Sequence, residues 1–175
     1  KVTLNFIPML NPDGAERFTR RNSAFIDLNR DAARLQFPES IALKKALKMV
    51  KPKFGFNLHD QDTRYSAGNS DKQATISFLA PPFNYERDMN LVRENTMKLI
   101  SKINSDLQEI IPGHIGRYSD EFEPRAFGDN FIKWGVSSVL IESGGWKGDD
   151  EKQFIRKLNF ISLISAFASI SSQSY

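Results

Sequence analysis

The chain has 175 residues, which is enough for a single domain with a substantial hydrophobic core. Its net charge of +3 is too weak to indicate binding to nucleic acid or to an anionic membrane, and its lysines are spread along the chain. It contains no cysteine, which excludes a disulfide scaffold, a thiolate metal site and a cysteine nucleophile. Any bound metal would therefore need His, Asp or Glu ligands.

The first fifty residues combine a strand pattern, a loop and a helix pattern. Residues 2–10 (VTLNFIPML) are typical of a β-strand, and a turn follows at 11–14 (NPDG). Residues 15–37 are rich in arginine and show no clear period, so we expect a structured loop there. Residues 38–50 predict a helix, because Pro38 suits the first helical position and apolar residues recur near helical spacing.

The rest of the chain alternates strand-like and helix-like segments around a Gly/Pro-punctuated region at 112–130. This alternation predicts one α/β domain, with a mixed or mostly parallel central sheet flanked by helices. The most apolar segment, 160–170, is shorter than the roughly 20 residues of a membrane span, so we expect a core helix and no membrane contact. The expected strands are 53–59, 74–80 and 136–142, and the expected helices are 86–110 and 150–171.

Two polar residues stand where predicted strands end, which is where open α/β sheets bind their ligands. His59 is one of only two histidines and closes the strand KFGFNLH. Glu142 closes the apolar run VSSVLIE, where a carboxylate is costly to bury unless it has a partner. A lone histidine in such a place is more often a hydrogen-bonded structural residue than a ligand. A strand-end glutamate can equally serve as a cap or as one side of a salt bridge.

Five arginines lie within residues 17–34, and this cluster reads either as a solvated basic loop or as an anion site. Asn29 and Arg30, in the segment IDLNRD, are suited to gripping a carboxylate or a phosphate, because a guanidinium bonds two oxygens and an amide adds a donor. Together with His59 and Glu142, this pair forms the parts of a metal-assisted hydrolase for a substrate that carries a carboxylate.

Three segments in order, NPDGAERFTRRNSAFIDLNRD, FNLHD and VLIESGG, resemble the zinc metallocarboxypeptidases (funnelins) over most of the chain. The resemblance implies a zinc cofactor and a peptide substrate with a free C-terminal carboxylate. The residues that match the motifs of that family have the following implied roles: His59 as a zinc ligand, Glu142 as the general base, Arg20 (or its neighbour Arg21) as the group that polarises the scissile carbonyl, Asn29 and Arg30 as the carboxylate anchor, and Tyr118 as the mobile catalytic tyrosine.

The family takes its other two zinc ligands from an H-x-x-E motif upstream of NPDG, and this chain has no such motif. The resemblance therefore implies that residues 1–175 are the C-terminal part of a larger catalytic domain that lacks its N-terminal strands. We expect the chain alone to bind zinc poorly and to lack peptidase activity, since a catalytic zinc needs about three protein ligands. A sheet that lacks strands also exposes an edge, so self-association through that edge is possible.

Two other functions remain open at this stage. The same residues could serve a zinc deacylase or amidohydrolase that acts on N-acyl amino acids. They could also form a non-catalytic carboxylate-binding module in which the metal has been lost. A nucleic-acid role resting on the arginine cluster is disfavoured, because the net charge of the whole chain is only +3.

Overall fold

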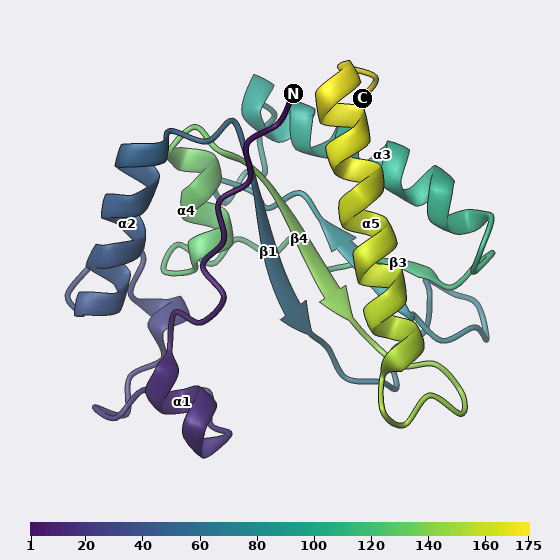
Figure 1. Cartoon of the computed structure of the whole chain (residues 1–175), viewed down its shortest axis with the longest axis horizontal. Coiled ribbons are helices and arrows are strands. Elements are labelled where there is room, and N and C mark those ends of the chain that lie inside the picture. The colour runs from purple at the N-terminus through teal and green to yellow at the C-terminus, as the bar shows by residue number, and fades with distance from the viewer.

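A four-stranded mixed sheet organises the computed structural model, which describes residues 1–175 (Figure 1). Its strand order is β1-β4-β2-β3. Strand β1 (Phe54–Asp60) runs parallel to β4 (Ser137–Ser143), and β2 (Ile76–Leu79) is antiparallel to β4 and parallel to β3 (Ile115–Arg117). The α/β fold with a mixed sheet that the sequence predicts is confirmed.

Three of the helices begin at residues that favour helix initiation. Pro38 occupies the first turn of α2, and the side chain of Asn90 accepts a hydrogen bond from the Arg93 amide at the start of α3. Asn11 caps α1 in the same way through the amide of Gly14. The helices are α1 (Pro12–Arg17), α2 (Pro38–Val50), α3 (Leu91–Gln108), α4 (Phe127–Lys133) and α5 (Gln153–Ser172), with a 3₁₀ turn, η1, at Leu28–Arg30.

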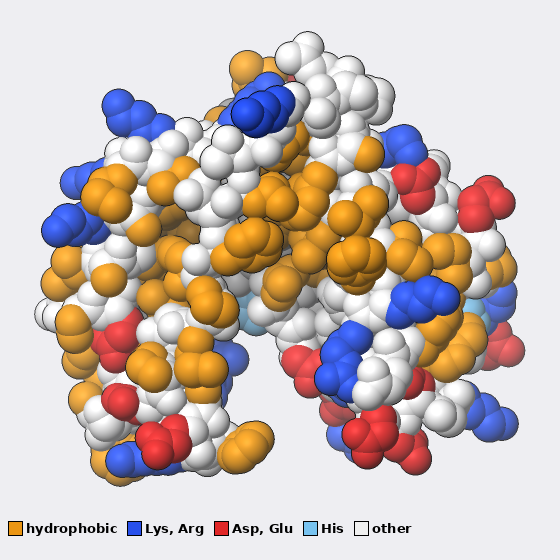
Figure 2. Space-filling view, in the orientation of Figure 1, with side chains coloured by type: hydrophobic (Ala, Val, Ile, Leu, Met, Phe, Trp, Pro, Cys, Tyr) orange, Lys and Arg blue, Asp and Glu red, His pale blue; other side chains and the backbone are white.

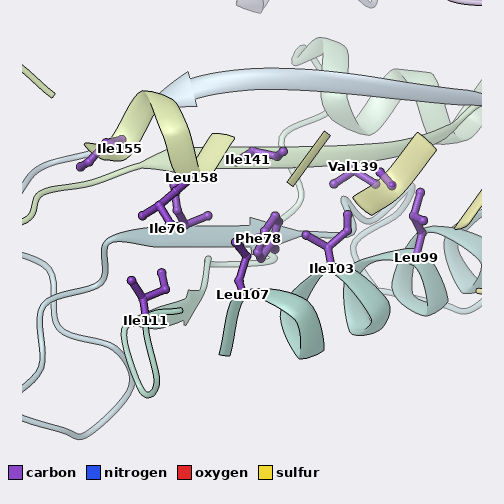
Figure 3. Packing of buried hydrophobic residues seen from close by; sticks show 11 residues of the cluster. Ile76, Phe78, Leu99, Ile103, Leu107, Ile111, Val139, Ile141, Ile155 and Leu158 are labelled. Atoms are coloured by element: carbon purple, nitrogen blue, oxygen red, sulfur yellow. The ribbon is translucent and has the colours of Figure 1, made fainter. Parts of the chain in front are cut away.

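One face of the sheet carries the main hydrophobic core (Figure 3). Because side chains alternate along a strand, Val139 and Ile141 of β4 and Ile76 and Phe78 of β2 all face this core. Helices α3 and α5 cover them, and the helical members of the cluster are Leu99, Ile103, Leu107, Ile155, Leu158 and Ala166. Helix α5 is the one helix long and apolar enough to cross a membrane, and here one side of it packs into this core.

The opposite face of the sheet is the one that carries the polar strand ends. A smaller cluster of Leu43, Phe127, Phe131 and Val136 packs there, from α2, α4 and the residue before β4. Since Phe54 and Phe56 of β1 pack against the main core, the alternate residues of β1, including His59, lie on this second face. The alternation of β4 places Glu142 on the same face.

Three expectations about elements differ from the structure. Residues 2–10 form no strand, because they make no backbone hydrogen bond and a strand requires a partner. The predicted loop 15–37 contains the end of α1 and the turn η1. The region 112–130 contains the three-residue strand β3 and the start of the seven-residue helix α4, both too short to show a period in the sequence.

Candidate active site

His59 and Glu142, 83 positions apart in sequence, are direct partners across the parallel β1–β4 pair. Both stand one residue before the carboxyl end of their strand and, by the alternation above, on the same face of the sheet. Figure 2 shows the surface hollowed below the carboxyl ends of these strands, between the lobe that carries α1 and the loop that precedes α5. The fold therefore brings the imidazole and the carboxylate to one crevice.

The imidazole of His59 is held in a form that can ligate a cation. Its Nε2 atom is buried and has no hydrogen-bond partner. Burial lowers the pKa of His59 below its ordinary value, and the positive charges of Arg20 and Arg30 lower it further. The ring is therefore neutral at neutral pH, with an unsatisfied nitrogen that a metal ion or a polar ligand could engage.

Glu142 is a buried carboxylate whose proton affinity is unusually high. Burial raises the pKa of Glu142 to about 7, and the neighbouring charge of Asp60 raises it further while Arg20 lowers it. A carboxylate with a pKa near neutrality can both take and return a proton, which is the property that a general base needs. The glutamate is therefore a chemically competent base.

Arg20 lies close enough to the strand ends for its charge to act on both His59 and Glu142. Its Nε donates to Oδ2 of Asp27 at 2.8 Å, and this bond fixes a side chain that is otherwise 59% exposed. Its neighbour Arg21 instead donates to the carbonyl oxygen of Phe25, within its own loop. Of the two arginines that the motif offers, Arg20 is therefore the one whose charge acts on the residues of the crevice.

Asn29 and Arg30 are both anchored to the segment around α4. Oδ1 of Asn29 accepts the backbone N–H of Phe127 at 2.9 Å, so its amide group is oriented and keeps its N–H donors for another partner. Nε of Arg30 lies 3.2 Å from Oε2 of Glu123. The salt bridge of Glu123 to Arg125 lowers the pKa of Glu123 to about 2, so Glu123 stays ionised and holds the Arg30 guanidinium in place.

Tyr118 stands directly after β3, and its amide donates to the Phe78 carbonyl at 3.0 Å. Burial raises the pKa of Tyr118, and the negative charge of Glu142 raises it further. Because Ile115 of β3 packs on the main core, the alternation of the strand places Tyr118 on the opposite face, which carries Glu142, although the two residues are 24 positions apart in sequence. The structure brings together His59, Glu142, Arg20 and Tyr118, with the Asn29–Arg30 pair on the adjoining loop.

These residues do not form a complete zinc site by themselves. His59 supplies one ligand, and no group of three or more His, Asp or Glu side chains in the structure could hold a metal ion. A catalytic zinc takes about three protein ligands. The orphan Nε2 of His59 suits one bond to such an ion, while the rest of the coordination shell is not supplied by the side chains around it.

Two residues of this site were not identified from the sequence. Asp27 holds Arg20, and its only signal in the sequence is its place in the segment IDLNRD, two residues before Asn29. Glu123 holds Arg30, but it lies in a region without periodicity and 93 positions away from its partner. Nothing in a single sequence connects two such residues, so this pairing becomes visible only in three dimensions.

No family model matches the sequence, and no curated protein matches it. Among solved structures, the chain is similar to murein-tripeptide amidase MpaA from Escherichia coli O157, with a TM-score of 0.50 and 16% sequence identity. The match covers 90% of this chain but only 65% of that chain, so part of the amidase has no counterpart here. At this level of identity the likeness shows the fold alone. The chain therefore shares the α/β fold of this amidase over most of its length.

Proposed function

We propose that this chain carries part of the active site of a zinc-dependent hydrolase that cleaves the amide bond next to a free carboxylate, as a metallocarboxypeptidase does. The observation that supports this most directly is the pairing of His59 with Glu142 on adjacent parallel strands. The order of the site residues along the chain also agrees with the sequence resemblance: the Asn29–Arg30 pair, here called the carboxylate clamp, comes first and the general base Glu142 comes last. The carboxypeptidase-like fold is compatible with it.

In this proposal the residues of the chain divide the work between binding and proton transfer. Asn29 and Arg30 hold the terminal carboxylate of the substrate, which leaves the last amide bond within reach of Glu142. Glu142 takes the proton of the attacking water and returns it to the leaving amine. Arg20 stabilises the negative charge that develops on the carbonyl oxygen, a contribution typically worth about 3–4 kcal/mol.

We propose further that His59 is one zinc ligand and that the other ligands come from outside these 175 residues, so that the chain is the C-terminal part of a larger catalytic domain. The single ligand found here and the partial coverage of the structural neighbour both support this. Accordingly, the 175-residue chain should bind zinc weakly in a calorimetric titration. Tight binding of one equivalent of zinc would contradict the proposal.

Hydrolysis should be tested with protein expressed from the complete coding sequence. We expect release of the last residue from a blocked dipeptide with a free carboxylate, and no release from the same dipeptide with an amidated C-terminus. Glu142→Gln should lower kcat by about 10²–10⁴-fold, the usual contribution of a general base, with little change in KM. Turnover of the amidated dipeptide at an equal rate would contradict the carboxylate clamp.

An amidase or deacylase is the second candidate, and it is favoured by one observation: the structural neighbour is named as an amidase. The clamp and the base would serve either reaction. Comparing blocked dipeptides with N-acyl amino acids in the same assay separates the two. A non-catalytic carboxylate-binding module would bind both kinds of compound and turn over neither.

A further inference from the structure

A buried arginine joins three segments of the chain beside the crevice. The side chain of Arg93, in the first turn of α3, is only 4% exposed. Its guanidinium donates to the carbonyl oxygen of Ala80, just after β2, at 3.2 Å, and to the carbonyl oxygens of Arg87 and Asp88 in the next loop. Its Nη2 donates to Oδ2 of Asp120 at 3.2 Å. Arg93 therefore links the end of β2, the loop before α3 and the loop after β3.

Asp120 is the acceptor that three arginines share. Arg87 and Arg117 each approach its carboxylate at 3.4 Å, in addition to Arg93. Arg117 is 77% exposed, so its pair is screened by water and contributes little. Arg93 is buried, so loss of its charged partner leaves a cation without compensation. The bond between Arg93 and Asp120 is therefore the one that holds this loop.

The loop of residues 118–123 also carries Tyr118, two positions before Asp120. The Tyr118 amide donates a hydrogen bond to the Phe78 carbonyl at 3.0 Å. The backbone of Tyr118 thus directs its side chain to the face of the sheet that carries Glu142. That backbone is fixed on one side by β2 and on the other by the attachment of Asp120 to Arg93.

We propose that Asp120 is a positioning residue that keeps the phenol of Tyr118 over the face of the sheet that carries Glu142, by anchoring the loop to Arg93. The inference rests on the proposed function only in treating Tyr118 as part of the active site. The anchor itself is a property of the folded chain without metal or substrate. A failed test of the anchor is therefore distinguishable from a failed test of hydrolysis.

The test uses the metal-free 175-residue chain, labelled with ¹³C at the ζ carbon of tyrosine. The chain has four tyrosines, and Tyr118→Phe assigns the resonance of interest. In Asp120→Asn, the Tyr118 pKa should fall toward that of a free tyrosine, about 10. Hydrogen exchange at the backbone amide of Tyr118 should become about tenfold faster, as the loss of a charge-assisted hydrogen bond implies.

Arg117→Gln is the matched control, because it removes an exposed partner of Asp120 and leaves the Arg93 bond intact. It should change neither the Tyr118 pKa nor its exchange rate. If Asp120→Asn does not fold, Asp120→Glu keeps the charge for Arg93 but lengthens the link, and it should still shift the Tyr118 resonance. An unchanged Tyr118 titration in the folded variant would overturn the proposal, as would an equal effect of Arg117→Gln.

Discussion

Asp129, at the start of α4, is a buried carboxylate that the fold keeps partly protonated. Burial raises the pKa of Asp129 to about 6, although its Oδ1 accepts the Glu123 amide at 3.1 Å. Between about pH 4 and pH 6 the folded state keeps a proton on Asp129 that the unfolded state releases. Asp129 therefore lowers the free energy of unfolding progressively over this pH range, and the full loss remains above pH 6. Asp129→Asn keeps the acceptor and removes the charge.

We expect Asp129→Asn to raise the free energy of unfolding by about 1–2 kcal/mol at pH 8 and to leave it nearly unchanged near pH 4. Urea unfolding at the two pH values measures the difference. Asp62→Asn is a control with the opposite sign, because the side chain of Arg64 lowers the pKa of that exposed carboxyl to about 2. A gain for Asp129→Asn that is equal at both pH values would contradict this account.

The Asn29–Arg30 pair allows a separate prediction about substrate binding. Asn29→Asp keeps an oxygen to accept the Phe127 amide but replaces the free amide donors with a negative charge. In the hydrolysis assay proposed above, it should raise KM for a substrate with a free carboxylate much more than it lowers kcat. Arg21→Gln, on the same loop, is the matched control and should leave both constants near their original values. A fall in kcat alone would show that Asn29 does not bind the substrate.

Gly144 allows two backbone segments to approach each other closely at the end of a strand. A Cβ at Gly144, directly after β4, would lie 2.1 Å from the carbonyl oxygen of Ala74. We expect Gly144→Ala to destabilise the chain at the upper end of the about 1–3 kcal/mol typical of overpacking. Gly148 is the control: it has a φ of +82° and nothing within 4 Å, so alanine there should cost about 1 kcal/mol. Equal thermal shifts for the two variants would contradict the steric explanation.

The elements that could be predicted from the sequence are those with a continuous hydrophobic pattern. The limits of β1, β4 and α2 agree with the prediction to within one residue. For that reason the sequence also places His59 and Glu142 correctly at the ends of their strands. The strand expected at 2–10 is absent, because an apolar pattern specifies a strand only where a neighbour accepts its hydrogen bonds. The partners Glu123 and Asp120 lie in loops, where spacing along the chain carries no information about contact.

The two faces of the central sheet have separate roles. The face toward α3 and α5 buries the main core, and the face toward α4 carries the polar crevice. Strand β1, which supplies His59, is an edge strand that is paired only with β4. The candidate ligand therefore stands at the open edge of the sheet, where further strands or another chain could be added without disturbing the core.

This open edge leads to a prediction about association. Figure 2 shows hydrophobic side chains gathered over the N-terminal segment, β1 and α5, and Leu58 of β1 and Phe6 are 57% and 73% exposed. We propose that the 175-residue chain self-associates through this edge, because unpaired strand groups and exposed apolar area both favour it. Sedimentation velocity should show a mass that rises with concentration. Leu58→Lys should abolish the rise, and Met49→Lys, an equally drastic change on exposed α2, should not. A chain that stays monomeric at every concentration would contradict the proposal.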